Sequence, residues 1–241
     1  MDALVLRLTP YKDTDLVVQL LARGLGRVSA FARGARASKK RFAGALEPFQ
    51  LLDVELEPGR GELSLLQNAS VKRAFLGLRA DLGAMAHAGY AAELAREMTR
   101  DHEPADALLA LSIAFLEVLD ARPATSAELR ALELGALDAA GFAPELSRCA
   151  RCGGELPASP CFDADAGGLA CLRCARPGAP RLAPAAADAL RVLQSGGLTT
   201  AAALPPVPLE NARNALRAFI AHHVGRRLRS VEFMSQVGAD L

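Results

Sequence analysis

The stretch FQLLDVELEPGRGELSLLQNASVKRAF (49–75) decides the fold of the N-terminal part of the chain. Apolar and polar residues alternate along FQLLDVELE (49–57), the period of a strand with one buried face. PGRGE (58–62) is a turn, and the residues that follow it read as the second strand of a hairpin. Three earlier runs bounded by Pro or Gly add strands: ALVLRL (3–8), DLVVQLLA (15–22) and GRVSAFARG (26–34). Five short strands predict a small closed barrel of the OB type; an SH3-like barrel fits the count almost as well.

The hydrophobic period changes to that of a helix at about residue 78. Residues 78–141 predict three antiparallel helices, the last of which begins with a capping box of Thr125 and Glu128 and ends at Gly141. Further helices are expected over 182–196 and from about Pro208 to about Arg229. We therefore expect an α+β multidomain protein with three parts: an OB-type barrel (1–77), an α-helical domain (78–241) and a cysteine-bearing insert in the latter (147–178).

Four of the five cysteines form two Cys-x-x-Cys pairs, Cys149 with Cys152 and Cys171 with Cys174, and eighteen residues separate the pairs. This spacing is typical of a four-cysteine zinc site, in which two knuckles complete a tetrahedron of thiolates. Because four thiolates leave no open coordination position, we predict a structural Zn²⁺ in a zinc-ribbon-like motif. A redox pair or simply buried cysteines are the alternatives. Cys161 is expected to pack within the ribbon, although it could substitute as a ligand.

Composition indicates a cytosolic protein without a membrane span. The longest apolar stretch, ALLALSIAFLEVL (107–119), contains Ser112 and Glu117 and is shorter than the roughly 20 residues that a span needs. We expect no secretory signal, because Asp2 stands where a positive n-region should be and the apolar run Ala3–Leu6 is too short for an h-region. The sequence lacks a nucleophile elbow, a phosphate loop and an H-E-x-x-H motif, and its four histidines form no obvious ligand set. We therefore expect neither an enzyme nor a small-molecule substrate.

Charge is distributed unevenly, although the net charge is only +1. Residues 1–80 hold 13 basic against 8 acidic residues, residues 81–148 hold 5 against 12, and residues 149–241 hold 10 against 7. The run RGLGRVSAFARGARASKKR (23–41) contains seven basic residues and no acidic one. A solvated face is the simplest interpretation of such a run.

On a barrel, however, this basic run suits nucleic acid, because positive groups neutralise phosphates and an exposed aromatic ring can stack on a base. Phe31 and Phe42 are candidates for stacking, and Phe31 is equally a candidate for the core. A second basic run lies near the C-terminus, without an acidic residue between Glu210 and Glu232. The run places Arg27 and Arg33 on or beside the third strand, and Arg36, Lys39, Lys40 and Arg41 in the loop that follows it.

Three blocks of sequence, in order along the chain, resemble the RecO family of bacterial recombination mediators. They are ALVLRLTPYKDTDLVVQLL (3–21), GRVSAFARGARASKKRFAGALEPFQLLDVELEPGRGELSLL (26–66) and RRLRSVEFM (226–234). The resemblance implies a non-enzymatic DNA repair protein that binds single- and double-stranded DNA. It also implies annealing of complementary strands coated with single-strand-binding protein, and cooperation with RecR in loading RecA. Such a protein is expected in the cytoplasm, associated with the nucleoid.

The resemblance also implies roles for particular residues. It assigns DNA binding to the six basic residues of the barrel and zinc ligation to the four paired cysteines, which many but not all family members share. A groove in the helical part is expected to receive the C-terminal tail of single-strand-binding protein, and Arg217, Arg226 and Arg227 are candidate partners for the acidic residues of that tail. The alternative function is a zinc-containing scaffold, or an RNA-binding component, of a transcription or translation complex.

Overall fold

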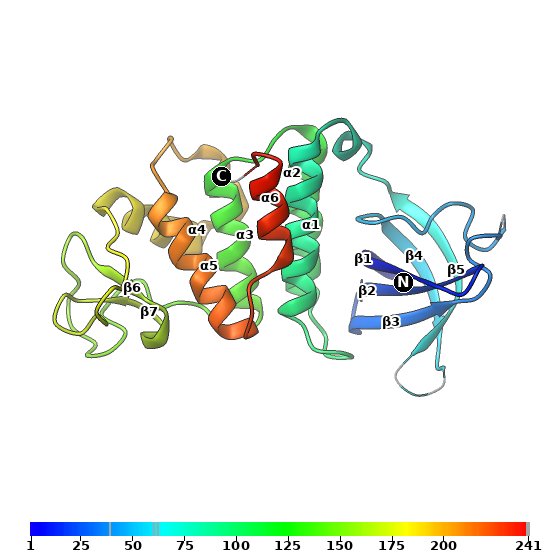
Figure 1. The fold of residues 1–241 in the computed structure, drawn as a ribbon, viewed down its shortest axis with the longest axis horizontal. Coiled ribbons are helices and arrows are strands. Elements are labelled where there is room, and N and C mark those ends of the chain that lie inside the picture. Colours follow the sequence, from blue (N-terminus) through cyan, green and yellow to red (C-terminus); the bar gives the residue numbers. More distant parts are fainter. Residues whose placement is uncertain (39, 60, 62, 240–241) are drawn as a thin grey trace. The chain divides into compact units, whose positions relative to one another are not determined.

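The structure is a computed structural model that describes residues 1–38, 40–59, 61 and 63–239. The chain forms two compact units, Met1–Pro123 and Ala124–Leu241, which are described separately below. Figure 1 shows the chain from its N-terminal strands in blue to its C-terminal helix in red. Among the described residues, no helix combines the length and the apolar character needed to cross a membrane.

The first unit begins with a closed five-stranded barrel, as the sequence predicted (Figure 1). Neighbouring strands follow the order β1-β2-β3-β5-β4, and β1 pairs with β4 to complete the circle. All pairs are antiparallel except the pair of β3 and β5, so the barrel is not a simple meander but has the crossed order of an OB-type fold. The strands are β1 (Asp2–Tyr11), β2 (Asp15–Ala22), β3 (Gly26–Ala32), β4 (Leu51–Glu57) and β5 (Ser64–Arg73).

Alternation along the strands separates the core from the outer surface. In β2 and β3 the inward-facing positions are almost inaccessible to water, whereas the residues between them are mostly half-buried. Val, Leu and Ala dominate these inward positions, because the narrow interior of a five-stranded barrel accommodates small and branched side chains. The core comprises Ala3, Val5, Val18, Leu20, Ala22, Val28, Ala30, Ala32, Phe42, Ala45, Leu52, Val54, Leu66 and Ala69.

Two helices complete the first unit, namely α1 (Leu82–Glu97) and α2 (Asp106–Ala121), which follow the short helix η1 (Leu76–Ala80). Their connecting loop returns to the start of β3, where the N–H of His102 donates to the carbonyl of Arg27 at 3.0 Å. Gly26 has a φ of 69°, and a Cβ there would lie 1.7 Å from the carbonyl oxygen of Glu103. Only glycine permits this approach, which fixes the loop against the barrel.

The described residues of the second unit form four α-helices, one short 3-10 helix and a small two-stranded sheet. Helix α3 begins with the predicted capping box, in which Thr125 and Glu128 exchange hydrogen bonds between side chain and backbone. The sheet lies in the insert between α3 and α4. The elements are α3 (Ser126–Ala139), β6 (Cys161–Asp163), η2 (Ala164–Ala166), β7 (Gly168–Ala170), α4 (Pro184–Ala203), α5 (Glu210–Val224) and α6 (Arg229–Gln236).

The single C-terminal helix expected from about Pro208 to about Arg229 is wrong, because the structure has two helices there. Helix α5 stops at Val224, and Gly225 adopts a left-handed conformation with a φ of 77°. Leu228 is extended, and α6 begins after it. A glycine just beyond the last helical residue is a common stop signal, and basic residues on both sides of it obscured the signal in the sequence.

Candidate nucleic-acid interface and cysteine cluster

The outer face of β1, β2 and β3 combines basic, polar and aromatic side chains. The strand registers align its residues into two rows across the three strands. Since alternate residues of a strand point to the same side, both rows lie on the outside of the barrel. The first row is Arg7, Gln19 and Ser29, and the second is Thr9, Val17 and Phe31.

Tyr11 extends this outer face at the end of β1. Its side chain is 48% exposed, and its ring lies edge to face with the ring of Phe31 at a centroid distance of 5.6 Å. The ammonium of Lys12 lies 5.5 Å from the centre of the Tyr11 ring. An exposed ring held by a second ring and flanked by a cation is suited to stacking on a nucleic-acid base. Sequence reasoning missed Tyr11 because it ended the first strand before Pro10, which instead pairs with Leu16 in the sheet.

The basic loop after β3 starts beside this face. Arg33, Arg36, Lys40 and Arg41 are all exposed, whereas Lys39 lies outside the described residues. The carboxylate of Asp15 accepts a 2.6 Å hydrogen bond from the N–H of Gly34, which fixes where the loop leaves the strand. A guanidinium nitrogen of Arg36 donates to the carbonyl of Asp13 at 3.3 Å. These contacts hold the base of the loop next to the turn that follows Tyr11.

The stacking role considered for Phe42 is wrong. Its side chain is 1% exposed and belongs to the barrel core. The loop folds back onto the barrel at this point, where the N–H of Ala69 on β5 donates to the carbonyl of Arg41 at 3.0 Å. Phe42 therefore closes the core beneath the basic loop, while the guanidinium of Arg41 lies 5.1 Å from the centre of its ring.

Arg27 differs from the other described basic residues of the run because its side chain is mostly buried. Its Nε donates to the carboxylate of Asp101 at 2.7 Å, and its Nη1 donates to the carbonyl of Arg96. Only 22% of its side chain is exposed. These contacts tie β3 to the loop between α1 and α2.

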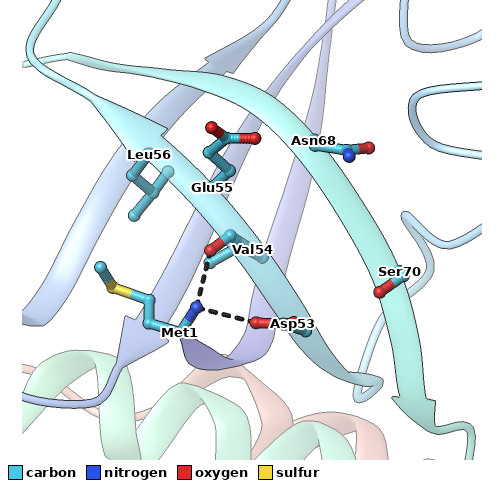
Figure 2. A pocket seen from close by; sticks show the side chains of 7 residues that line it. All are labelled: Met1, Asp53, Val54, Glu55, Leu56, Asn68 and Ser70. Carbon is cyan, nitrogen blue, oxygen red and sulfur yellow. Dashed lines mark hydrogen bonds and ion pairs between the residues drawn. The ribbon is translucent and has the colours of Figure 1, made fainter.

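The outer face of β4 and β5 has the opposite character. A hollow of about 400 Å³ lies on it, lined by Met1, Asp53, Val54, Glu55, Leu56, Asn68 and Ser70 (Figure 2). The Met1 ammonium donates to the Asp53 carboxylate and to the Val54 carbonyl, both at 2.8 Å. Carboxylates at this face repel phosphates, so the basic and aromatic face of β1, β2 and β3 is the candidate nucleic-acid interface of the barrel.

In the second unit, the four paired cysteines come together. Their sulfur atoms all lie within 4.8 Å of one another, and none of the four forms a disulfide. The four residues are Cys149, Cys152, Cys171 and Cys174. A tetrahedron with metal–sulfur bonds of about 2.3 Å separates its sulfurs by roughly 3.8 Å, so this cluster fits a zinc ion. Cys161 pairs with Ala170 in the small sheet and stands apart from the cluster.

The backbone around the first knuckle favours a thiolate. Burial raises the pKa of the Cys149 thiol, but hydrogen bonds from backbone N–H groups outweigh this effect and lower that pKa to about 6. One donor is the N–H of Cys171, which lies 3.3 Å from the Cys149 sulfur. The second knuckle thereby stabilises the thiolate of the first. The thiolate is the form that binds metals.

Of the three C-terminal arginines predicted to bind a partner, one lies in the middle of α5 and two lie beyond its end. Arg217 is half-buried on α5, and Arg226 and Arg227 are exposed in the connection to α6. Phe233 on α6 is 43% exposed nearby in sequence.

Comparison with known proteins gives a consistent result over the whole chain. The family model described as "Recombination protein O N terminal" matches residues 1–75, and "Recombination protein O C terminal" matches residues 79–232. A protein of Anaeromyxobacter sp. (strain K) named "DNA repair protein RecO" is 53% identical, covering 97% of this chain and 94% of the relative. Proteins of the same name from Myxococcus xanthus and Geobacter sulfurreducens are 46% and 37% identical; the alignments cover 99% and 98% of this chain, and 98% and 97% of the relatives.

Proposed function

The chain belongs to the RecO family, and from this premise we propose that it is a non-enzymatic recombination mediator in DNA repair. It binds single- and double-stranded DNA and anneals complementary strands coated with single-strand-binding protein. It acts with RecR to promote loading of RecA. The observation that carries the DNA-binding part of this proposal is the exposed Tyr11 ring, which lies against Phe31 beside the basic loop that follows β3.

The proposed mechanism is electrostatic and involves no bond chemistry. Two complementary strands repel each other through their phosphates, and the exposed cations Arg33, Arg36, Lys40 and Arg41 reduce that repulsion. Arg7 adds a positive charge on the adjoining strand face. Stacking on Tyr11 holds a base unpaired and accessible to its complement. We exclude Arg27 from the proposed phosphate contacts because Asp101 and Arg96 hold its guanidinium in a mostly buried position. Lys39, which lies outside the described residues, stays a prediction from the sequence.

We propose that the four-cysteine cluster binds a structural Zn²⁺ through Cys149, Cys152, Cys171 and Cys174. When bound, the ion supplies the cross-link that folds the insert between α3 and α4, a segment with only two three-residue strands of its own. The donor set of four thiolates supports this role, because it leaves no position for a substrate.

The second basic run is proposed as the partner surface. Arg226 and Arg227 are exposed and carry the positive charge that the acidic C-terminal tail of single-strand-binding protein requires, with Arg217 on the preceding helix as a further contact.

Binding of single-stranded DNA as a function of salt tests the proposed interface. Each phosphate contact contributes about 0.7 to the slope of log K against log salt for single strands, so Arg33→Ala is expected to lower that slope by about 0.7. Arg23→Ala is the matched control: Arg23 belongs to the same basic run and is exposed, but it lies at the opposite end of β3. Equal slopes for the native protein and Arg33→Ala would contradict the interface.

The scaffold function proposed as the alternative predicts different behaviour. A zinc-containing scaffold or RNA-binding component has no reason to accelerate pairing of complementary DNA strands. Acceleration of annealing therefore separates the two functions, whereas nucleic-acid binding alone does not.

A further inference from the structure

Asp163 is a buried carboxylate that contacts both halves of the cysteine cluster. Its side chain is 1% exposed, and its Oδ2 accepts hydrogen bonds from the guanidinium of Arg151 at 3.1 and 3.3 Å. The same oxygen accepts a 3.1 Å hydrogen bond from the backbone N–H of Arg176. Arg151 lies inside the first knuckle, between Cys149 and Cys152, and Arg176 follows the second knuckle by two residues. One oxygen atom thus bridges two segments that are distant in sequence.

The strand that carries Asp163 is itself fixed to the helices of the second unit. The preceding residue, Phe162, is 2% exposed, and its ring lies edge to face with that of Phe219 on α5 at 5.6 Å. Successive residues of a strand point to opposite sides, so Phe162 packs against the helix while Asp163 faces the knuckles. The short strand β6 therefore places a rigidly held negative charge at a defined position between the two knuckles.

Asp163 remains ionised in spite of its burial. Burial raises the pKa of this carboxyl, but the hydrogen bonds from Arg176 and Arg151 outweigh that effect, and the pKa lies below its ordinary value. A buried carboxylate without such donors would be strongly destabilising, so its presence here requires both partners. The hydrogen bonds from Arg151 and Arg176 all fall on the same oxygen, Oδ2, so contact with the two knuckles orients the side chain.

We propose that Asp163 is a positioning residue for the metal site: it holds the two cysteine knuckles at the separation that the ion requires and thereby determines how tightly the ion is retained. This inference rests on the proposed zinc site. Asp163 holds the guanidinium of Arg151 and the backbone of Arg176 next to the ligands. Zn²⁺ with four thiolates carries a net charge of −2, so the Arg151 guanidinium held beside it stabilises the loaded cluster. Partners of this kind, beyond the ligands themselves, typically change metal affinity 10- to 100-fold.

Zinc release to a chromogenic chelator and competition for zinc test the proposal on the full chain. Asp163→Asn keeps the shape of the side chain but removes its charge, and we expect zinc affinity to fall about 10- to 100-fold, with faster release. Asp165→Asn is the matched control. Asp165 is 39% exposed and pairs with the side chain of Arg176. Asp165→Asn therefore removes a nearby charge but leaves in place the hydrogen bonds that Asp163 accepts from the two knuckles. We expect Asp165→Asn to stay within about twofold of the native protein.

A second substitution keeps the test decisive if Asp163→Asn folds poorly. Arg151→Gln removes the guanidinium from a side chain that is 43% exposed, and it leaves the bond from the Arg176 N–H in place. Its zinc affinity is expected to fall between those of the native protein and Asp163→Asn. Cobalt substitution adds a direct readout, because the absorption bands of tetrahedral thiolate-bound Co²⁺ shift if the knuckles move apart.

The outcomes are distinguishable. If Asp163 only stabilised the fold, Asp163→Asn would lower the thermal midpoints of the zinc-loaded and zinc-stripped proteins equally and leave zinc affinity unchanged, which would overturn the inference. Equal losses in Asp163→Asn and Asp165→Asn would overturn it too, because they would reflect net charge alone. If the native protein binds neither zinc nor cobalt, the zinc proposal fails and this inference fails with it, while the proposed DNA interface is unaffected.

Discussion

Arg27 and Asp101 pair at 2.7 Å, although they are 74 positions apart in the sequence. The pair joins β3 of the barrel to the loop between α1 and α2, beside the hydrogen bond from His102 to the Arg27 carbonyl. Just beyond the other end of the same strand, Arg33 is exposed, two residues after Phe31, whose ring contacts that of Tyr11. The basic run therefore contains residues of two kinds. Arg27 links the barrel to its helices, and the described basic residues from Arg33 onward carry exposed positive charge.

Replacing Arg27 is expected to affect stability rather than DNA binding. Arg27→Ala removes a charged hydrogen bond to Asp101 and another to the carbonyl of Arg96. Because Asp101 is 54% exposed, we expect the free energy of unfolding to fall by only about 1–2 kcal/mol in denaturant titrations. The salt dependence of DNA binding should equal that of the native protein. A lower salt slope at native stability would instead make Arg27 a phosphate contact.

Tyr11 is expected to contribute to single-strand binding by stacking. Tyr11→Ala should weaken binding of a single-stranded oligonucleotide by about 1–3 kcal/mol, as measured by fluorescence anisotropy. Since the side chain is 48% exposed, the free energy of unfolding should change little. Tyr11→Phe keeps the ring and should retain native affinity. Unchanged affinity in Tyr11→Ala would remove Tyr11 from the interface.

Removal of the metal is expected to unfold the cysteine insert and leave the barrel intact. The side chains of Arg148, Arg151, Arg173 and Arg176 are already exposed, but trypsin also needs an unfolded backbone around them. Chelation should supply it, so that cleavage within 148–176 becomes faster than in the zinc-loaded protein. Single-stranded DNA binding by the barrel should persist. Identical digestion rates with and without chelator would show that the insert folds without metal.

Glu145 makes a pH-dependent contribution to stability. Hydrogen bonds from the side chain and backbone of Ser147, aided by Arg148, lower the pKa of Glu145 to about 2 from 4.5. Because the folded pKa is the lower one, this contribution is fully present above pH 4.5 and is lost as the pH falls towards 2. Glu145→Gln should therefore lower the free energy of unfolding at pH 7 by about 1–2 kcal/mol. Denaturant titrations should show this difference narrowing below pH 4.5, and a difference independent of pH would contradict the assignment.

Patterns local in sequence predicted much of this molecule. Alternation located the five strands, the capping box located the start of α3, and the knuckle spacing located a cluster that the structure brings together. Features that depend on distant residues were not predictable. Phe42 is an aromatic residue within a basic run, and only the return of the loop to β5 places it in the core.

The roles of Arg27, Tyr11 and Asp163 were hidden for the same reason. Arg27 looks like its basic neighbours until the loop containing Asp101 is placed against it. Tyr11 follows a proline, which suggested the end of a strand, yet the outward-facing alternation continues through it. Asp163 is one acidic residue in a polar insert, and only the fold shows that it contacts both knuckles.

The most direct test of the central claim is the rate at which complementary oligonucleotides coated with single-strand-binding protein anneal, measured over a range of salt concentrations. The native protein and Arg23→Ala should both accelerate annealing, with an effect that weakens as salt rises. Arg33/Arg36/Lys40→Ala should lose most of that acceleration while remaining folded and zinc-loaded. Equal acceleration by the triple variant would place the DNA interface elsewhere on the protein, and no acceleration by the native protein would contradict the mediator function itself.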